Sequence, residues 1–279
     1  MSNPYILFDT RLVARRWVST SLLRVTLRGA ELANIGTTGL DQRFKLIPCD
    51  APVADALLQA DNWYGYWRGL ADEQRPPVRT YTFVAFRPEV GEVDFDVAIH
   101  ADTAGPGMDF CANAPLYSRA LICGPLGCVP GHDQVGLAWL PDNDQLDRVL
   151  IVADETALPA ARAILASLHP HVSGVAIIEV PHEGDCASLP RPVDVELHWC
   201  VRSRGETALE HLPFPVSSDA PVELTEEPYW YEAEAGSFSG WVAGESHWVA
   251  QIRRAAKNAG IPREHMSFMG YWRNDAPGG

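Results

Sequence analysis

Three residues with useful chemistry stand close together in the run Arg79-Thr80-Tyr81-Thr82. The guanidinium of Arg79 is a planar, forked donor that suits the paired oxygens of a diphosphate. Tyr81 offers an aromatic face, and the hydroxyl of Thr82 can bond to polar ring atoms. Such a run is also ordinary on the surface of a β-sheet, so these residues alone do not establish a ligand site.

A second candidate for anion binding is the run Gly105-Pro106-Gly107. Glycines let backbone N–H groups come close to a diphosphate at a helix N-terminus, where the helix dipole also favours an anion. By itself the run is equally typical of a turn. Together with Arg79 it predicts two separate contacts to one diphosphate. Just upstream, His100 is either a donor to a ligand or a histidine satisfied at the end of a strand.

The segment Ala153–Ala160 places an acidic pair, Asp154 and Glu155, between a predicted strand and a predicted helix. Open α/β sheets bind ligands at the C-terminal ends of their strands, so this segment predicts a ligand site. Thr156 is expected to cap the helix and to donate to the ligand. The alternative for the acidic pair is that its charges only favour the positive end of the helix dipole.

The first half of the chain reads as β-structure that positions the arginine and the glycine run. Short segments of alternating apolar residues are separated by clusters of Gly, Pro, Asp and Asn. Five or six such antiparallel strands predict a closed barrel. The aromatic-rich stretch Val53–Gln74 is expected to be an excursion with a short helix. The expected strands are Leu12–Trp17, Leu22–Leu27, Phe44–Ile47, Thr80–Phe86, Val93–Ile99 and Arg119–Cys123.

The second half alternates apolar strands with helices, which predicts a parallel sheet covered on both faces. A Pro-, Gly- and Asp-rich seam over residues 130–147 separates the halves. We therefore expect a barrel domain over residues 1–132 and an α/β domain over residues 145–279. The expected strands are 147–153, 174–180, 196–201, 239–243 and 268–271, with helices over 157–168 and 246–258.

Five blocks in order, the last of them in two segments, resemble the motifs of the siderophore-interacting protein family, whose members are FAD-binding flavoproteins of the ferredoxin-reductase-like superfamily. The resemblance covers nearly the whole chain, and it depends on the ordered set because no single motif is specific enough. It implies an N-terminal antiparallel Greek-key β-barrel that binds FAD and a C-terminal α/β domain like those that bind nucleotides. The blocks are Arg79–Thr82, Asp96–Met108, Leu121–Gly127, Ala153–Ala160, Trp241–Glu245 and Phe268–Arg273.

The family's activity is the FAD-dependent reduction of ferric siderophores, which releases Fe(II) in the cytoplasm. The resemblance implies NAD(P)H or ferredoxin as the electron source. The flavin carries this chemistry, so no side chain is expected to act as a nucleophile and no metal is expected to be bound by the protein. The implied FAD contacts are Arg79, Tyr81, Thr82, Ala98, His100, Asp102, Gly105, Gly107, Met108, Asp154, Thr156, Glu245, Tyr271 and Trp272.

The chain departs from the family pattern at several positions. Val84 replaces an arginine two residues after the threonine of the first motif, and Ala101 and Ala153 replace glycines. Many members attract anionic siderophores with a basic cluster. Here Lys45 and Lys257 are the only lysines, so arginines would have to serve. The substitute siderophore-binding residues are Arg253, Arg254, Lys257 and Arg263, for which a solvated helix face is the favoured alternative.

The bulk properties are those of a globular protein with a formal charge of −14. An acidic surface repels phosphate backbones, which argues against nucleic acid as a partner. Neither a targeting segment nor a membrane span is visible, so we expect a cytoplasmic monomer. The six cysteines lack the close spacing that a zinc site or an iron–sulfur cluster needs.

Two other functions remain open from the sequence. One is a flavin or ferredoxin reductase that uses a different electron acceptor. The other is a protein that binds a siderophore or a flavin without turnover, since the second domain lacks a full G-x-G-x-x-G motif.

Overall fold

The computed structural model describes residues 5–99, 105–127, 135–140, 144–216, 230–231 and 236–274. The chain divides into two compact units. The first comprises Met1–Val18 and Leu23–Gly136, and the second comprises Ser19–Leu22 and Leu137–Pro277. Within the described ranges, no helix is long and apolar enough to cross a bilayer.

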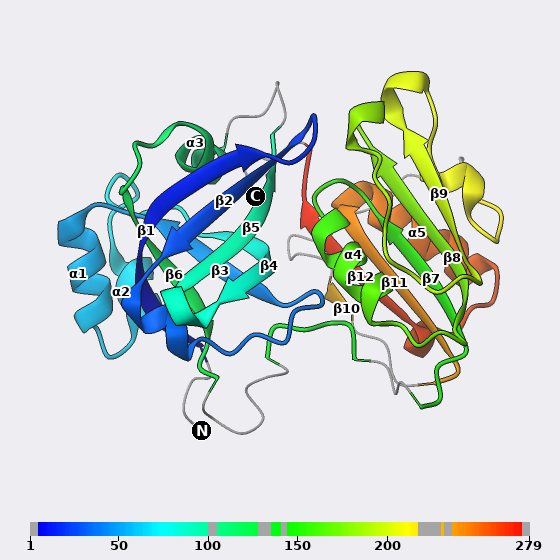
Figure 1. Cartoon of the computed structure of the whole chain (residues 1–279), viewed down its shortest axis with the longest axis horizontal. Helices are drawn as coiled ribbons and strands as arrows, with labels where there is room; N and C mark the ends of the chain where they lie inside the picture. Colours follow the sequence, from blue (N-terminus) through cyan, green and yellow to red (C-terminus); the bar gives the residue numbers. More distant parts are fainter. Residues whose placement is uncertain are drawn as a thin grey trace. The chain divides into compact units, whose positions relative to one another are not determined.

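The first unit contains a closed barrel of six antiparallel strands (Figure 1), which confirms the predicted fold. The strands follow one another around the barrel in the order β1-β2-β5-β4-β3-β6, which is a Greek-key arrangement. Their bounds are Tyr5–Trp17 for β1, Leu22–Arg28 for β2, Arg43–Pro48 for β3, Arg79–Arg87 for β4, Glu92–Ala98 for β5 and Arg119–Pro125 for β6.

Strand β1 begins at Tyr5, seven positions before the expected start at Leu12. The first half of β1 pairs with β6, and this pairing closes the barrel. Thr10 occupies a buried position and interrupts the apolar alternation on which the prediction depended. Its hydroxyl donates to the carbonyl of Ala120 at 2.6 Å, so the buried polar group is satisfied.

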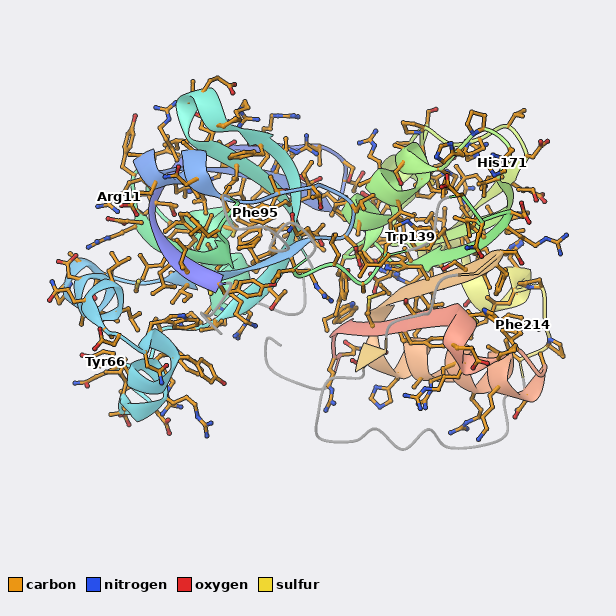
Figure 2. The ribbon with its side chains drawn as sticks, turned by 90° about the horizontal axis from the view of Figure 1, so that it is seen from below. Arg11, Tyr66, Phe95, Trp139, His171 and Phe214 are labelled. Atoms are coloured by element: carbon orange, nitrogen blue, oxygen red, sulfur yellow. The ribbon has the colours of Figure 1, made fainter. Side chains whose placement is uncertain are left out.

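Aromatic rings fill much of the barrel interior. Phe44 stacks on Phe83 with ring centroids 4.5 Å apart, and it meets Phe95 edge-on at 5.2 Å. Figure 2 labels Phe95 among the barrel strands. Buried aromatic pairs stabilise a fold beyond the area they remove from water. Other buried members of this core are Leu12, Val25, Leu27, Leu46, Val93 and Ile122.

The excursion between β3 and β4 contains two short helices, where the sequence predicted one. These are α1 (Ala51–Gln59) and α2 (Trp63–Gly69). The second helix was missed because seven residues are too few to show a helical period. The side chains of Asp50 and Asn62 accept N-cap hydrogen bonds at the two starts. Tyr66 on α2 is exposed (Figure 2).

Helix α3 (Pro106–Asn113) connects β5 to β6 and begins at the glycine run, as expected. Gly105 is its N-cap residue. Near its C-terminus, the guanidinium of Arg15 donates to the carbonyls of Ala112 and Ala114. Helix α3 is thereby fastened to β1. Two 3-10 helices also belong to this unit, η1 (Ala30–Asn34) and η2 (Pro88–Val90).

The second unit contains a six-stranded sheet in the order β10-β12-β11-β7-β8-β9. The five strands from β12 to β9 are parallel, which confirms the predicted sheet, and β10 adds an unpredicted antiparallel edge. The bounds are Arg148–Ala153 for β7, Ser173–Val180 for β8, Val195–Val201 for β9, Trp230–Tyr231 for β10, Phe238–Glu245 for β11 and Met266–Trp272 for β12.

Helices α4 (Leu158–Ser167) and α5 (Ser246–Asn258) cover opposite faces of this sheet (Figure 1). The apolar side of α5 packs on alternate sheet residues such as Leu150 and Val152. Gly260 follows α5 with φ +77°, the left-handed C-terminal signal that the sequence predicted. The 3-10 helices of this unit are η3 (Glu183–Asp185), η4 (Arg202–Arg204), η5 (Ala208–His211) and η6 (Arg263–His265).

Candidate functional site

In the barrel unit, the N-terminus of α3 lies directly against two side chains of β4. A Cβ atom added to Gly107 would lie 2.6 Å from Arg79 Cγ and 3.1 Å from the hydroxyl oxygen of Tyr81. Glycine therefore permits this close approach of the helix to the strand. The structure thus brings together four of the predicted contacts: Arg79, Tyr81, Gly105 and Gly107.

The guanidinium of Arg79 is half-buried and donates to the carbonyl of Val78 at 3.0 Å. Among the described residues, no carboxylate pairs with it. Burial lowers the pKa of this guanidinium from its usual value, although an arginine remains charged at neutral pH. A half-buried cation beside a helix N-terminus, without an anionic side chain, favours an anionic ligand.

Tyr81 lies between the barrel core and α3. Its ring centroid is 5.0 Å from that of Phe95 and 6.2 Å from that of Phe44. Burial raises the pKa of its hydroxyl well above the usual value, and the thiol of Cys111 on α3 adds to this shift. The tyrosine is therefore neutral. Its expected contact with a flavin ring stays a prediction.

The other predicted FAD contacts of this unit do not all lie beside Arg79 and the start of α3. Thr82 is buried and lies on the face of β4 opposite the arginine and the tyrosine, because side chains alternate along a strand. Ala98 ends β5. Met108 packs on the barrel core and lines a pocket of about 420 Å³. His100 and Asp102 lie outside the described residues.

In the second unit, Asp154 is buried at the C-terminal end of β7 and its carboxylate accepts five hydrogen bonds. Oδ1 accepts from the main-chain N–H groups of Thr156 at 2.8 Å and Ala157 at 3.2 Å, and from the Thr156 hydroxyl at 2.5 Å. Oδ2 accepts from the main-chain N–H of Glu245 and the indole N–H of Trp272, both at 2.8 Å. This carboxylate joins the ends of three neighbouring strands, β7, β11 and β12.

The expected capping role of Thr156 is wrong. The N-cap residue of α4 is Ala157, which makes no side-chain capping bond. The carboxylate of Asp154 accepts from the main-chain N–H groups of Thr156 and Ala157, and the Thr156 hydroxyl donates to the same oxygen.

Glu245 and Ser246 hold the ends of β11 and β12 together. The Glu245 side chain accepts the N-cap hydrogen bond of α5 from Trp248 N–H at 2.9 Å. The hydroxyl of Ser246 donates to the main-chain carbonyl of Trp272 at 2.9 Å. Tyr271 precedes that tryptophan, and both side chains are half-buried. Asp154, Glu245 and Trp272 are therefore neighbours, and the predicted FAD contacts of Glu245, Tyr271 and Trp272 stay predictions.

A network of charged side chains around Glu155 at this sheet edge was not predicted. Glu155 is fully buried and accepts from Arg202 at 2.6 Å, and Arg202 also reaches Glu179 at 3.5 Å. Glu179 accepts in turn from Thr207 Oγ1 at 3.2 Å and Ala208 N–H at 2.9 Å. Burial raises the pKa of Glu155 to about 7, with help from the neighbouring aspartate and opposition from the arginine. The network spans the C-terminal ends of β7, β8 and β9.

The basic residues proposed for siderophore binding lie on and after α5. Arg253 and Arg254 are half-buried, whereas Lys257 and Arg263 are exposed. Burial and the nearby charge of Arg263 lower the pKa of Arg253. Two like charges are therefore close together, and their binding role stays a prediction.

Comparison with known proteins decides the family. Residues 11–129 match the siderophore-interacting FAD-binding domain, and residues 146–275 match the siderophore-interacting protein domain. The chain belongs to the siderophore-interacting protein family. Among its relatives is the ferric vibriobactin reductase ViuB of Vibrio cholerae, 27% identical over 94% of this chain and 87% of that protein.

Solved structures support the fold of this family member. A siderophore utilization protein from T. fusca matches with a TM-score of 0.69 and 23% identity, over 99% of this chain and 96% of that one. The ferredoxin reductase in carbazole 1,9a-dioxygenase matches with a TM-score of 0.55 and 15% identity, over 98% of this chain and 71% of that one. The chain therefore has the ferredoxin-reductase-like fold.

The pairing of Glu155 with a distant arginine was not predicted from the sequence. Glu155 faces Arg202, which stands 47 positions later. A usable signal was present, because Glu155 stands two positions after one predicted strand of a parallel sheet and Arg202 comes directly after another. The C-terminal ends of such strands share one edge, so opposite charges placed there can meet.

Proposed function

We propose that this member of the family binds FAD and reduces ferric siderophores, which releases Fe(II) in the cytoplasm. The electron source in this proposal is NAD(P)H or ferredoxin. The observation that carries it is the half-buried guanidinium of Arg79, which has no carboxylate partner among the described residues, against the glycine start of α3 within a matched FAD-binding domain.

The residues present suit the diphosphate of FAD. Arg79 supplies forked donors, and the first turn of α3 supplies main-chain N–H groups without intrahelical partners. The missing side chain of Gly107 lets the start of α3 pack against Arg79, so that main-chain and guanidinium donors lie close together. Asp109, in the first turn, accepts from Asn113 at 2.8 Å and so has a local donor.

The chemistry that bound FAD supplies is the uptake of electrons from a donor and their delivery one at a time. The protein's own contribution is to bind and orient. Arg79 and the start of α3 hold the diphosphate, Tyr81 fixes the strand beside it, and Trp272 provides an aromatic surface at the ends of β11 and β12.

A ferric siderophore is the proposed substrate because its catecholate or hydroxamate oxygens are hard donors. Such donors hold Fe(III) far better than Fe(II), so reduction itself loosens the complex. Arg253, Arg254, Lys257 and Arg263 are the proposed contacts for an anionic siderophore. ViuB is named for the reduction of one ferric siderophore, which supports this substrate class.

The test is the visible absorbance of the purified protein under anaerobic conditions. NADH, NADPH or reduced ferredoxin is added first, and a ferric siderophore with a ferrous trap is added last. We expect flavin bands that bleach with one donor and return while the ferrous complex develops colour. A protein that takes up no FAD would exclude the proposal, and bleached flavin that reoxidises only with another acceptor would favour a flavin or ferredoxin reductase.

A further inference from the structure

The carboxylate of Asp154 is an unusual feature of the second unit. It is 3% exposed, and no cation among the described residues forms an ion pair with it. Its charge is held by N–H and O–H donors from three segments that are far apart in the chain. Hydrogen bonds to a buried charge are stronger than those between neutral groups, so these segments are tied firmly.

Two of the five donors are side chains, the Thr156 hydroxyl on the same turn and the indole of Trp272 on a distant strand. The main chain of this tryptophan is fixed separately, since its carbonyl accepts from the Ser246 hydroxyl at 2.9 Å. The pairing of β11 with β12 shifts register after Gly244, so Glu245 pairs with Trp272. An indole ring on a fixed main chain still turns about its side-chain bonds. The 2.8 Å bond from Nε1 to Asp154 stops that rotation.

The surrounding backbone leaves room for this bond. A Cβ atom on Gly244 would lie 2.6 Å from Asp154 Oδ2, the oxygen that accepts from the indole. Any larger residue there would push the carboxylate away from Trp272.

We propose that Asp154 is a positioning residue that acts through Trp272, rather than a contact to FAD as the sequence implied. The carboxylate fixes the orientation of the indole, and the oriented indole gives Trp272 its effect on bound FAD. The effect on bound FAD rests on the proposed function, whereas the orientation of the indole by Asp154 does not.

The first experiment needs no flavin. The ¹H–¹⁵N spectrum of the full chain contains indole N–H signals from nine tryptophans, and Trp272→Phe identifies the signal of Trp272. Asp154→Asn replaces one acceptor oxygen by an N–H donor while keeping the shape of the side chain. We expect the Trp272 signal to move upfield in Asp154→Asn, because it loses a charged acceptor. Gly244→Ala is a second route to the same shift and keeps the test decisive if Asp154→Asn does not fold.

The second experiment is a double-mutant cycle on FAD binding. We expect Asp154→Asn and Trp272→Phe each to raise the Kd for FAD about tenfold, which corresponds to about 1.4 kcal/mol. The double variant should bind no more weakly than either single variant, because both changes remove the same interaction. The fluorescence emission of bound flavin should change by a similar amount in the two single variants and in the double variant. A merely structural role for Asp154 would not give this non-additivity.

Asp185→Asn is the matched control, since Asp185 is another carboxylate of this unit that is buried and hydrogen-bonded. It should leave the Trp272 signal and the Kd unchanged. A Trp272 signal that stays in place in Asp154→Asn would overturn the proposal. Additive effects on the Kd would overturn it as well, because Asp154 would then act independently. A wild-type chain that binds no FAD would instead overturn the proposed function, and the spectrum would still decide whether Asp154 fixes the indole.

Discussion

At the scale of single residues, the two units differ in how their buried charged side chains are stabilised. Within the part of the chain that the structure describes, Arg79 is half-buried without an anionic partner, whereas Asp154 accepts five hydrogen bonds and Glu155 accepts from Arg202. A charge left partly unsatisfied near a helix start is an incomplete site that a ligand can complete. A carboxylate that already accepts hydrogen bonds from several protein donors instead stabilises the fold. This difference supports the binding role proposed for Arg79 and the positioning role proposed for Asp154.

Arg79→Ala should weaken FAD binding while the protein remains folded. The loss of charge-assisted hydrogen bonds costs about 1.5–3 kcal/mol, which corresponds to a Kd roughly 10- to 100-fold higher. Titration of the apoprotein with FAD, followed by flavin fluorescence, measures this. Arg11→Ala is the matched control, because Arg11 is an exposed arginine of the same barrel that pairs with Asp9. Full flavin retention in Arg79→Ala would remove Arg79 from the diphosphate site.

Glu155 should make stability depend on pH. Its pKa of about 7 in the folded state lies above the ordinary glutamate pKa of 4.5, so the folded state binds more protons between these two pH values. The free energy of unfolding therefore falls as pH rises from about 4.5 to 7, by on the order of 3 kcal/mol at most, and this contribution is constant above that range. Urea unfolding of the wild type and of Glu155→Gln across this range measures the difference. Parallel pH profiles would show that Glu155 titrates at its ordinary pKa.

At the scale of elements, periodicity predicted most of the fold because each strand or helix carries its own apolar pattern. The six barrel strands and the five parallel strands were found this way. The pattern failed where an inward position was polar, as at Thr10, or where an element was as short as α2. Candidate site residues could be proposed where they lie together in one sequence motif. Hydrogen-bond partners such as Trp272, which stands 118 positions after Asp154, follow only from the folded sheet.

The start of α3 provides a prediction at this scale. Gly107→Ala places a Cβ atom 2.6 Å from the Arg79 side chain, so the arginine or the helix must shift. We expect FAD affinity to fall about tenfold, as for the loss of roughly 1.4 kcal/mol. Gly69→Ala on α2 is the control, because nothing lies within 4 Å of the added atom. If Gly107→Ala lowers affinity equally in the wild type and in Arg79→Ala, the effect does not pass through the arginine.

At the scale of the whole molecule, charge sets how an acceptor approaches. The chain carries a formal charge of −14, so its overall field repels an anionic ferric siderophore. The basic residues on and after α5, from Arg253 to Arg263, are the proposed local exception. These two effects respond to salt with opposite signs, because screening weakens repulsion and attraction alike.

We expect kcat/KM for an anionic ferric siderophore to rise between about 10 and 150 mM salt, where the screening length falls from roughly 30 to 8 Å. At these distances, repulsion by the net negative charge of the chain is stronger than attraction by the four basic side chains. A neutral ferric hydroxamate is the control, and its rate should change little. A rate that falls with salt for the anionic siderophore alone would mean that a basic surface steers it. Arg253→Ala with Arg254→Ala should then abolish that fall, which would place siderophore binding on α5.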